Sequence, residues 1–262
     1  MDSAFPWNLR MEHLGFAHLR LQWAEGLIHF DPCGGIGEGD VVVLLWNWSE
    51  RLAATAEAVR EGKKPIVAAA PEILEWLQGF GELEGSTGGA DVGGIGIELR
   101  AYQPMPEHSV RENLRKARSV LTHSRQVARR LRRKRRLPSC QPNIACLSFP
   151  SGARLLHMNL SLHRFAERSW IESVQKEFSR PNWLIAGCDY HHEQSVLAAL
   201  PGFEAERILV TDLLGDSRRS IGLPVQLLTP VVDQALSSGL EAYVFSPHAS
   251  FRFDTIPLTN QS

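Results

Sequence analysis

The stretch that decides the fold is Gly26-Leu27-Ile28-His29-Phe30-Asp31-Pro32, followed after a glycine-rich loop by Asp40-Val41-Val42-Val43-Leu44-Leu45. The first segment is apolar and stops at an Asp-Pro pair, which is typical of a strand that ends in a turn. The second is a continuous β-branched and leucine run, which favours a strand buried on both faces. Residues 17–23 alternate just before the first segment, so we expect the two to form a hairpin.

Outward from this stretch, strands and helices alternate in both halves of the chain. The first half predicts a helix over 49–61 with Ser49 as its cap, a strand over 65–70, a helix over 71–78 and a strand over 95–101. The second half predicts a hairpin of 143–149 with 154–158, helices over 165–178, 192–200 and 230–238, and strands over 183–187, 207–211 and 241–245. This repeated style predicts an α/β fold of two sheets packed face to face with helices outside.

The size and composition are those of an ordinary globular protein. The chain has 262 residues, 44% hydrophobic and 22% charged, with a formal net charge of −1. This balance excludes a disordered chain, a collagen-like repeat and a coiled coil, and it favours one domain over 1–262. No apolar run approaches the roughly 20 residues that span a bilayer, and the N-terminus does not read as a signal peptide. Four scattered cysteines indicate a reducing, cytoplasmic setting.

The near-zero net charge conceals a strongly basic segment. Residues 111–136 carry twelve Lys and Arg against one acid, a net +11, within a basic helical insertion predicted over 107–137. Such a segment binds a nucleic acid or an acidic protein, or else it is a solvated helix or lies against an acidic body of its own or a second subunit, in a homo-oligomer. The candidate polyanion-binding residues are Arg125, Arg129, Arg130, Arg132, Arg133, Lys134, Arg135 and Arg136.

The order and spacing of five landmarks resemble the metallo-β-lactamase superfamily, and within it the branch of ascorbate-6-phosphate lactonase. The landmarks are residues 26–32, 40–45, 93–97, 151–158 and 207–212. The resemblance implies an αββα sandwich. It also implies an H-x-H-x-D-H motif after the buried strand, whose side chains hold two metals that activate a water for hydrolysis.

The metal ligands that the resemblance implies are mostly missing. Trp46 and Trp48 stand in place of the first two histidines, Glu50 in place of the aspartate and Arg51 in place of the last histidine. An indole N–H only donates, and a guanidinium is a fixed positive charge, so neither binds a cation. Further on, the bridging aspartate falls at Leu160 and the last histidine at Asp212, while His108 is retained. We therefore expect a degenerate site without a conventional di-metal hydrolase, and no cofactor.

Two rearranged chemistries stay open. Asp189 and His191 follow a predicted strand and, with His108 and Asp212, offer enough donors for one zinc or manganese ion. Such a site would hydrolyse a small ester, lactone or phosphoester. Alternatively, Cys188 could act as a nucleophile with a histidine base, although a lone cysteine beside a buried strand is commonly a core residue.

Trp46 and Trp48 have two interpretations. They fill the space that metals and water would occupy, or they form an aromatic floor for a ligand, with Arg51 and Glu50 as polar anchors. Three functional hypotheses follow: a catalytically degenerate protein that acts by binding or assembly, a hydrolase with one rebuilt metal site, and a polyanion-binding protein. Metal content and salt dependence distinguish them.

Overall fold

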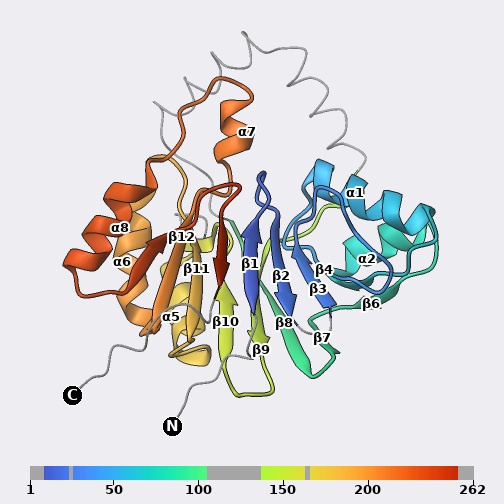
Figure 1. Ribbon diagram of the computed structural model, residues 1–262, viewed down its shortest axis with the longest axis horizontal. Coiled ribbons are helices and arrows are strands. Elements are labelled where there is room, and N and C mark those ends of the chain that lie inside the picture. The colour runs from blue at the N-terminus through green and yellow to red at the C-terminus, as the bar shows by residue number, and fades with distance from the viewer. Residues whose placement is uncertain (1–8, 24–25, 105–136, 163–165, 253–262) are drawn as a thin grey trace.

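Two seven-stranded sheets pack face to face between outer helices, which gives the αββα sandwich that the sequence predicted (Figure 1). The structure is a computed structural model, and it describes residues 9–23, 26–104, 137–162 and 166–252. Residues 107–136 of the predicted basic insertion, including His108, lie outside the described residues. Within these ranges no helix is long and apolar enough to cross a bilayer.

The first sheet contains the hairpin and the buried strand that opened the sequence analysis. Its strands, in spatial order, are β14 (Ser250–Arg252), β1 (Arg10–His13), β2 (Leu19–Trp23), β3 (Gly26–Phe30), β4 (Val41–Val43), β5 (Ile66–Ala68) and β6 (Glu84–Ser86). β2 and β3 pair antiparallel, with Leu19 opposite Phe30, as expected for the hairpin. β3, β4, β5 and β6 then run parallel, so the connections between them cross over one face of the sheet.

The second sheet repeats this plan. Its order is β13 (Ala242–Val244), β12 (Arg207–Thr211), β11 (Trp183–Gly187), β10 (Arg154–His157), β9 (Asn143–Ser148), β8 (Ile95–Ala101) and β7 (Gly89–Val92). β7 to β10 are antiparallel neighbours, and β10 to β13 run parallel. The carboxyl ends of β10, β11 and β12 therefore lie along one edge of the sandwich.

Three apolar layers hold the four structural layers together. The layer between the sheets includes fully buried Phe30 and Trp183. α1 (Ser49–Arg60) and α2 (Pro71–Gln78) cover the outer face of the first sheet, and α5 (Arg168–Glu177), α6 (Glu193–Ala199) and α8 (Leu228–Ser237) cover that of the second (Figure 1). Each strand of the sheet centres is thus buried on both sides, which is why its sequence reads as a continuous apolar run.

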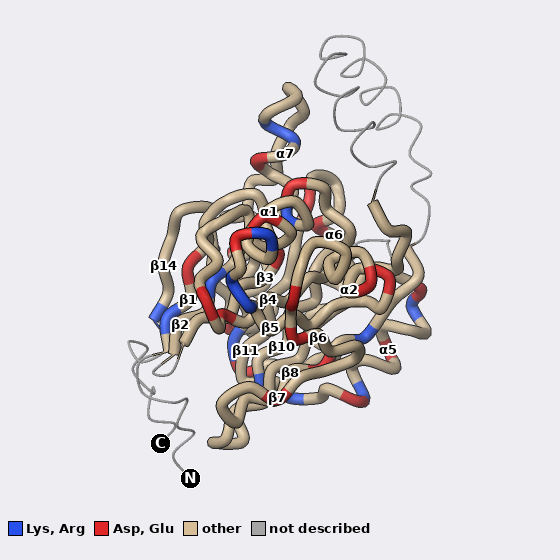
Figure 2. Tube along the Cα trace, turned by 90° about the vertical axis from the view of Figure 1, so that its right-hand side faces the viewer, with Lys and Arg blue, Asp and Glu red and all other residues tan. Residues whose placement is uncertain are grey.

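Most predicted elements are confirmed, with one correction at the start of α1. Trp48, and not Ser49, is the N-cap residue, and no side chain caps the helix. The Ser49 hydroxyl instead donates to the Glu50 carboxylate, at 2.7 Å. Figure 2 shows acidic and basic residues interspersed over the side of the molecule that carries α1 and α2.

Candidate functional site

The candidate site lies at the end of the sandwich where the carboxyl ends of the parallel strands meet, which is where ligands bind in open α/β sheets. Asp31 follows β3, and the loop to α1 follows β4. In the second sheet, Asn159 and Leu160 follow β10, and Asp212 follows β12. The backbone N–H of Asn143 donates to the Leu45 carbonyl at 2.7 Å and joins the two sheets at this end.

Three of the predicted former metal positions meet in an apolar cluster. Trp46 and Trp48 pack edge to face, with ring centroids 5.0 Å apart. Together with Leu214 they pack against buried Ala17, Leu160 and Leu213. The structure thus brings together residues after β4 and β10 that the sequence had placed in one site, and adds Leu213, which follows the predicted Asp212 after β12. It supports the interpretation that the tryptophans fill much of this space, because indoles bury large apolar areas.

Arg51 lies beside this cluster and is almost completely buried, with 2% of its side chain exposed. Its guanidinium carbon lies 5.3 Å from the centre of a Trp48 ring. Its Nη1 lies 3.9 Å from the Glu50 carboxylate, and its Nε has no hydrogen-bond partner among the described residues. The fixed charge that the sequence predicted is therefore inside the protein, where an incompletely paired cation is costly.

Asp31 is a buried acid that interacts electrostatically with Arg51. Its carboxylate accepts a hydrogen bond from the backbone N–H of Leu45 at 3.0 Å, and the N–H of Trp46 also donates to it. Burial raises the pKa of Asp31 from 3.8 to about 7, while Arg51 and these two donors oppose the rise. Asp31 thus fixes the backbone that presents the two tryptophans, which gives the Asp-Pro landmark a structural role.

A chain of hydrogen bonds runs beneath the glycine-rich loop. The backbone N–H of Cys33 donates to Nδ1 of His18 at 3.3 Å, so the proton of this ring lies on Nε2. His18 Nε2 donates to Nδ1 of His29, and His29 Nε2 donates to the Asp40 carboxylate, both at 3.1 Å. Burial lowers the pKa of His18 to about 3 and also lowers that of His29, which keeps both rings neutral.

Two more buried histidines end strands, one in each sheet. His13 ends β1 and accepts a hydrogen bond from the backbone N–H of Gly15 at 3.1 Å. His157 ends β10 and accepts one from the N–H of Asn159 at 2.9 Å. Burial lowers the pKa of His13 to about 4 and that of His157 to about 3. Both rings are neutral acceptors that hold a turn, while Nε2 of His13 is buried without a hydrogen-bond partner among the described residues.

The carboxylates of the predicted rebuilt metal site already have partners. Asp189 accepts a hydrogen bond from the N–H of Tyr190 at 2.7 Å and forms a buried ion pair with Arg218 at 3.3 Å. Asp212 accepts from the N–H groups of Leu214 and Gln226, at 3.1 and 3.2 Å, and burial raises its pKa. These bonds hold the start of α7 (Gly215–Arg219).

His191 does not join these two acids in a ligand cluster. Its side chain is exposed, and its ring lies against that of Tyr190 with centroids 3.9 Å apart. The described part of the chain contains no group of three or more His, Cys, Asp or Glu that could hold a metal ion. His108 lies outside it, so the four-residue site stays a prediction.

A di-metal centre does not fit most of the described residues at the positions where the resemblance implies ligands. Two indoles, a guanidinium and a leucine offer no lone pair to a cation, and Arg51 places a buried positive charge beside them. We therefore derive no step through a metal here. Cys188 is not available as a nucleophile either, because it is fully buried in the core and burial raises its pKa to about 12.

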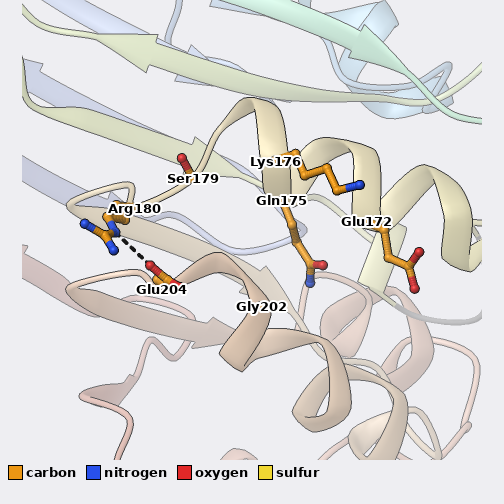
Figure 3. Close-up of a pocket in the computed structure, with 7 residues that line it drawn as sticks. All are labelled: Glu172, Gln175, Lys176, Ser179, Arg180, Gly202 and Glu204. Atoms are coloured by element: carbon orange, nitrogen blue, oxygen red, sulfur yellow. Dashed lines mark hydrogen bonds and ion pairs between the residues drawn. The ribbon is translucent and has the colours of Figure 1, made fainter.

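A second hollow, of about 580 Å³, lies between α5 and the short helix η2 (Leu200–Phe203) (Figure 3). Arg180 and Glu204, which line it, pair with each other at 2.7 Å. They precede β11 and β12, so the hollow lies at the amino ends of these strands, opposite the candidate site. Glu172, which also lines it, pairs with Arg168 at 3.0 Å, and the hollow contains none of the candidate site residues.

Comparison with solved structures relates the fold to metal-dependent enzymes. The metallo hydrolase Igni18 from Ignicoccus hospitalis is 14% identical, with a TM-score of 0.59, over 95% of this chain and 100% of that one. The isothiocyanate hydrolase from Delia radicum gut bacteria is 10% identical, with a TM-score of 0.57, over 93% and 99%. CmlA, a diiron β-hydroxylase from Streptomyces venezuelae, is 10% identical, with a TM-score of 0.58, over 95% and 55%.

At these identities the likeness establishes the fold and not the reaction. No protein-family model matches the chain, and a search of curated protein sequences finds no significant similarity. The fold is thus the metallo-hydrolase sandwich expected from the resemblance. What this chain does with it depends on the residues at the carboxyl ends of its strands.

The sequence did not predict the buried histidines or the electrostatic interaction between buried Asp31 and buried Arg51. His18 and His29 read as members of alternating strands, and nothing in that pattern distinguishes an inward ring from an exposed one. One signal was available, since His29 and Asp40 flank the glycine-rich loop that brings their side chains together. The polyanion-binding residues from Arg125 to Arg136 lie outside the described residues.

Proposed function

We propose that this protein has the hydrolase fold without di-metal hydrolysis and acts by binding. The observation that carries the proposal is the burial of Arg51 beside the cluster of Trp46, Trp48 and Leu160. Each of these residues replaces an expected metal ligand with a group that repels or cannot bind a cation. A positive charge there removes the electrostatic reason for a metal, so catalysis by metal-activated water is lost with it.

The test is metal content together with hydrolysis. Protein purified without a polyhistidine tag or chelator is analysed by mass spectrometry, before and after dialysis against zinc or manganese. We expect substoichiometric metal and no hydrolysis of ester, lactone or phosphoester substrates above the buffer rate. Near-stoichiometric metal that survives dialysis, with activity abolished by His108→Ala, contradicts the proposal and favours the rebuilt site of His108, Asp189, His191 and Asp212.

The basic segment supports a second proposal, that the protein binds a polyanion through residues 111–136. Its net charge of +11 is the supporting observation. With about five phosphate contacts, log K falls against log salt with a slope of about −4.5 on duplex DNA. Neutralising Arg129 to Arg136 should abolish both the binding and its salt dependence. The four free cysteines agree with a reducing, cytoplasmic location, which stays a proposal.

A further inference from the structure

The N-terminus of α1 opens on the candidate site and carries uncapped donors. α1 has 12 residues, Trp48 is its N-cap residue, and no side chain accepts a hydrogen bond from its first turn. The first turn of a helix presents backbone N–H groups and a partial positive charge, and both attract an anion. Every helix N-terminus has such N–H groups, so the side chains around this one determine whether it binds a ligand.

Two side chains add unpaired donors at the same place. Arg51 Nε and Trp48 Nε1 are both buried, and neither has a hydrogen-bond partner among the described residues. They belong to one group, because the guanidinium lies 5.3 Å from the Trp48 ring. A buried donor without an acceptor is destabilising, and more so when it is charged. Both groups only donate, so the partner that fits them is an acceptor with negative charge.

The neighbouring acids limit the charge of that partner. Glu50 lies 3.9 Å from the guanidinium, and the Asp31 carboxyl is buried close enough to interact with it electrostatically. These two acids weaken the positive potential at the guanidinium, so a dianion such as phosphate is disfavoured more strongly than a single negative charge. A singly charged, planar carboxylate matches the fork of a guanidinium and adds the least charge.

The apolar cluster indicates what the carboxylate is attached to. Trp46 and Trp48 are partly exposed, and Ala17, Leu160 and Leu213 lie behind them. Ligand sites of this kind combine apolar and aromatic walls with a few polar groups that fix orientation. A small aromatic or aliphatic body attached to the carboxylate would rest on the exposed faces of the indoles.

We infer that Arg51, Trp48 and the first turn of α1 bind the carboxylate of a small organic acid, with its apolar body against Trp46. The site stands where metal ligands were expected, so the change from His to Arg converts a cation site into an anion site. This inference rests on the proposed function, because a metal held at the same place would compete with Arg51 for the space.

The experiment is calorimetric titration of the full chain with benzoate, in a buffer that contains no carboxylate. Benzamide is the neutral isostere, and inorganic phosphate is the dianionic probe. Arg51→Met removes the charge and should weaken benzoate binding about 10- to 100-fold, and Trp48→Phe, which loses one neutral donor, about 3- to 10-fold. Arg60→Met on the same helix and Trp76→Phe on α2 are the matched controls and should leave the affinity unchanged. Arg51→Lys keeps the charge without the planar guanidinium fork and should give an intermediate loss of benzoate affinity. This variant tests the inference if Arg51→Met does not fold.

The outcomes separate this inference from the proposed function. Benzoate binding that Arg51→Met weakens, with benzamide much weaker, supports the carboxylate site. Absence of benzoate binding, equal binding of benzamide, tighter binding of phosphate, or affinity unchanged in both Arg51 variants overturns it. Metal-free protein that fails to bind benzoate refutes this inference alone, whereas retained metal refutes the proposed function whatever benzoate does.

Discussion

Three buried, neutral histidines should make the protein unfold in mild acid. Burial lowers the pKa of His13 from 6.5 to about 4, and those of His18 and His157 to about 3. Below pH 6.5 the unfolded chain binds a proton on each ring, while the folded chain does not until the pH reaches the lowered pKa. The stability that these neutral rings provide is therefore complete above pH 6.5 and is lost as the pH falls toward 4 and 3.

The size of the effect follows from the pKa differences. At pH 5, each neutral ring lowers the free energy of unfolding by about 2 kcal/mol, or by about 6 kcal/mol for the three, since one pKa unit corresponds to 1.36 kcal/mol. Asp31 acts in the opposite direction, because its pKa is raised from 3.8 to about 7. Between pH 8 and pH 5 it regains about 2.5 kcal/mol, so we expect a net loss of about 3.5 kcal/mol, a large part of a typical domain's stability.

Urea unfolding followed by circular dichroism at pH 8, 6.5 and 5 measures this loss. His157→Gln removes one titrating ring outside the His18–His29 chain and should reduce the loss by about 2 kcal/mol. His191→Asn is the matched control, because this side chain is already exposed and Asn tolerates its positive φ of 70°. Equal losses in wild type and His157→Gln would show that His157 is not buried in its neutral form, and the reasoning would be refuted.

Three further substitutions test other parts of the structure by the same unfolding assay. Asp31→Asn removes a buried acid whose ionisation costs up to about 4 kcal/mol at pH 8, so the variant should be more stable than wild type at that pH, by this amount less the contribution of a lost hydrogen bond. This gain should disappear below pH 4, and a gain independent of pH would contradict the raised pKa of Asp31. Trp183→Ala should lose about 3–5 kcal/mol, because the side chain is fully buried between the sheets, and a loss under about 1 kcal/mol would mean that it is not. Gly187→Ala should lose about 1–3 kcal/mol, because the new Cβ would lie 2.4 Å from the Asn159 carbonyl oxygen, and an unchanged midpoint would show that β11 can shift there.

The strands at the centres of both sheets could be predicted from the sequence, and most of the strands at the edges could not. β4, β11 and β12 are buried on both faces, so their apolar runs were clear. β6 and β7 lie at the sheet edges within the glycine-rich stretch 79–96, and none of their residues is fully buried. Their place in the fold comes from backbone pairing with β5 and β8, which leaves no hydrophobic pattern to read.

For the candidate site, the resemblance implied which expected ligands are absent from the sequence, but the sequence could not predict how the residues at those positions pack together. The missing histidines at Trp46, Trp48 and Arg51 followed from the resemblance alone. The contact of the tryptophans with Leu160 and Leu213 depends on two sheets closing over residues more than 100 positions apart. The burial of Arg51 depends on the same closure, and no local pattern distinguishes it from an exposed arginine at the start of a helix.

The last strand of the first sheet comes from the far end of the chain. β14 pairs antiparallel with β1, with Arg252 opposite Arg10, and the backbone of His13 is bonded to both Ala249 and His248. During synthesis, the sheet that begins with β1 stays open at that edge until residue 252 has left the ribosome. This sheet is therefore completed only after every strand of the second sheet has been made, and until then the edge of β1 is a place where a nascent chain can pair wrongly.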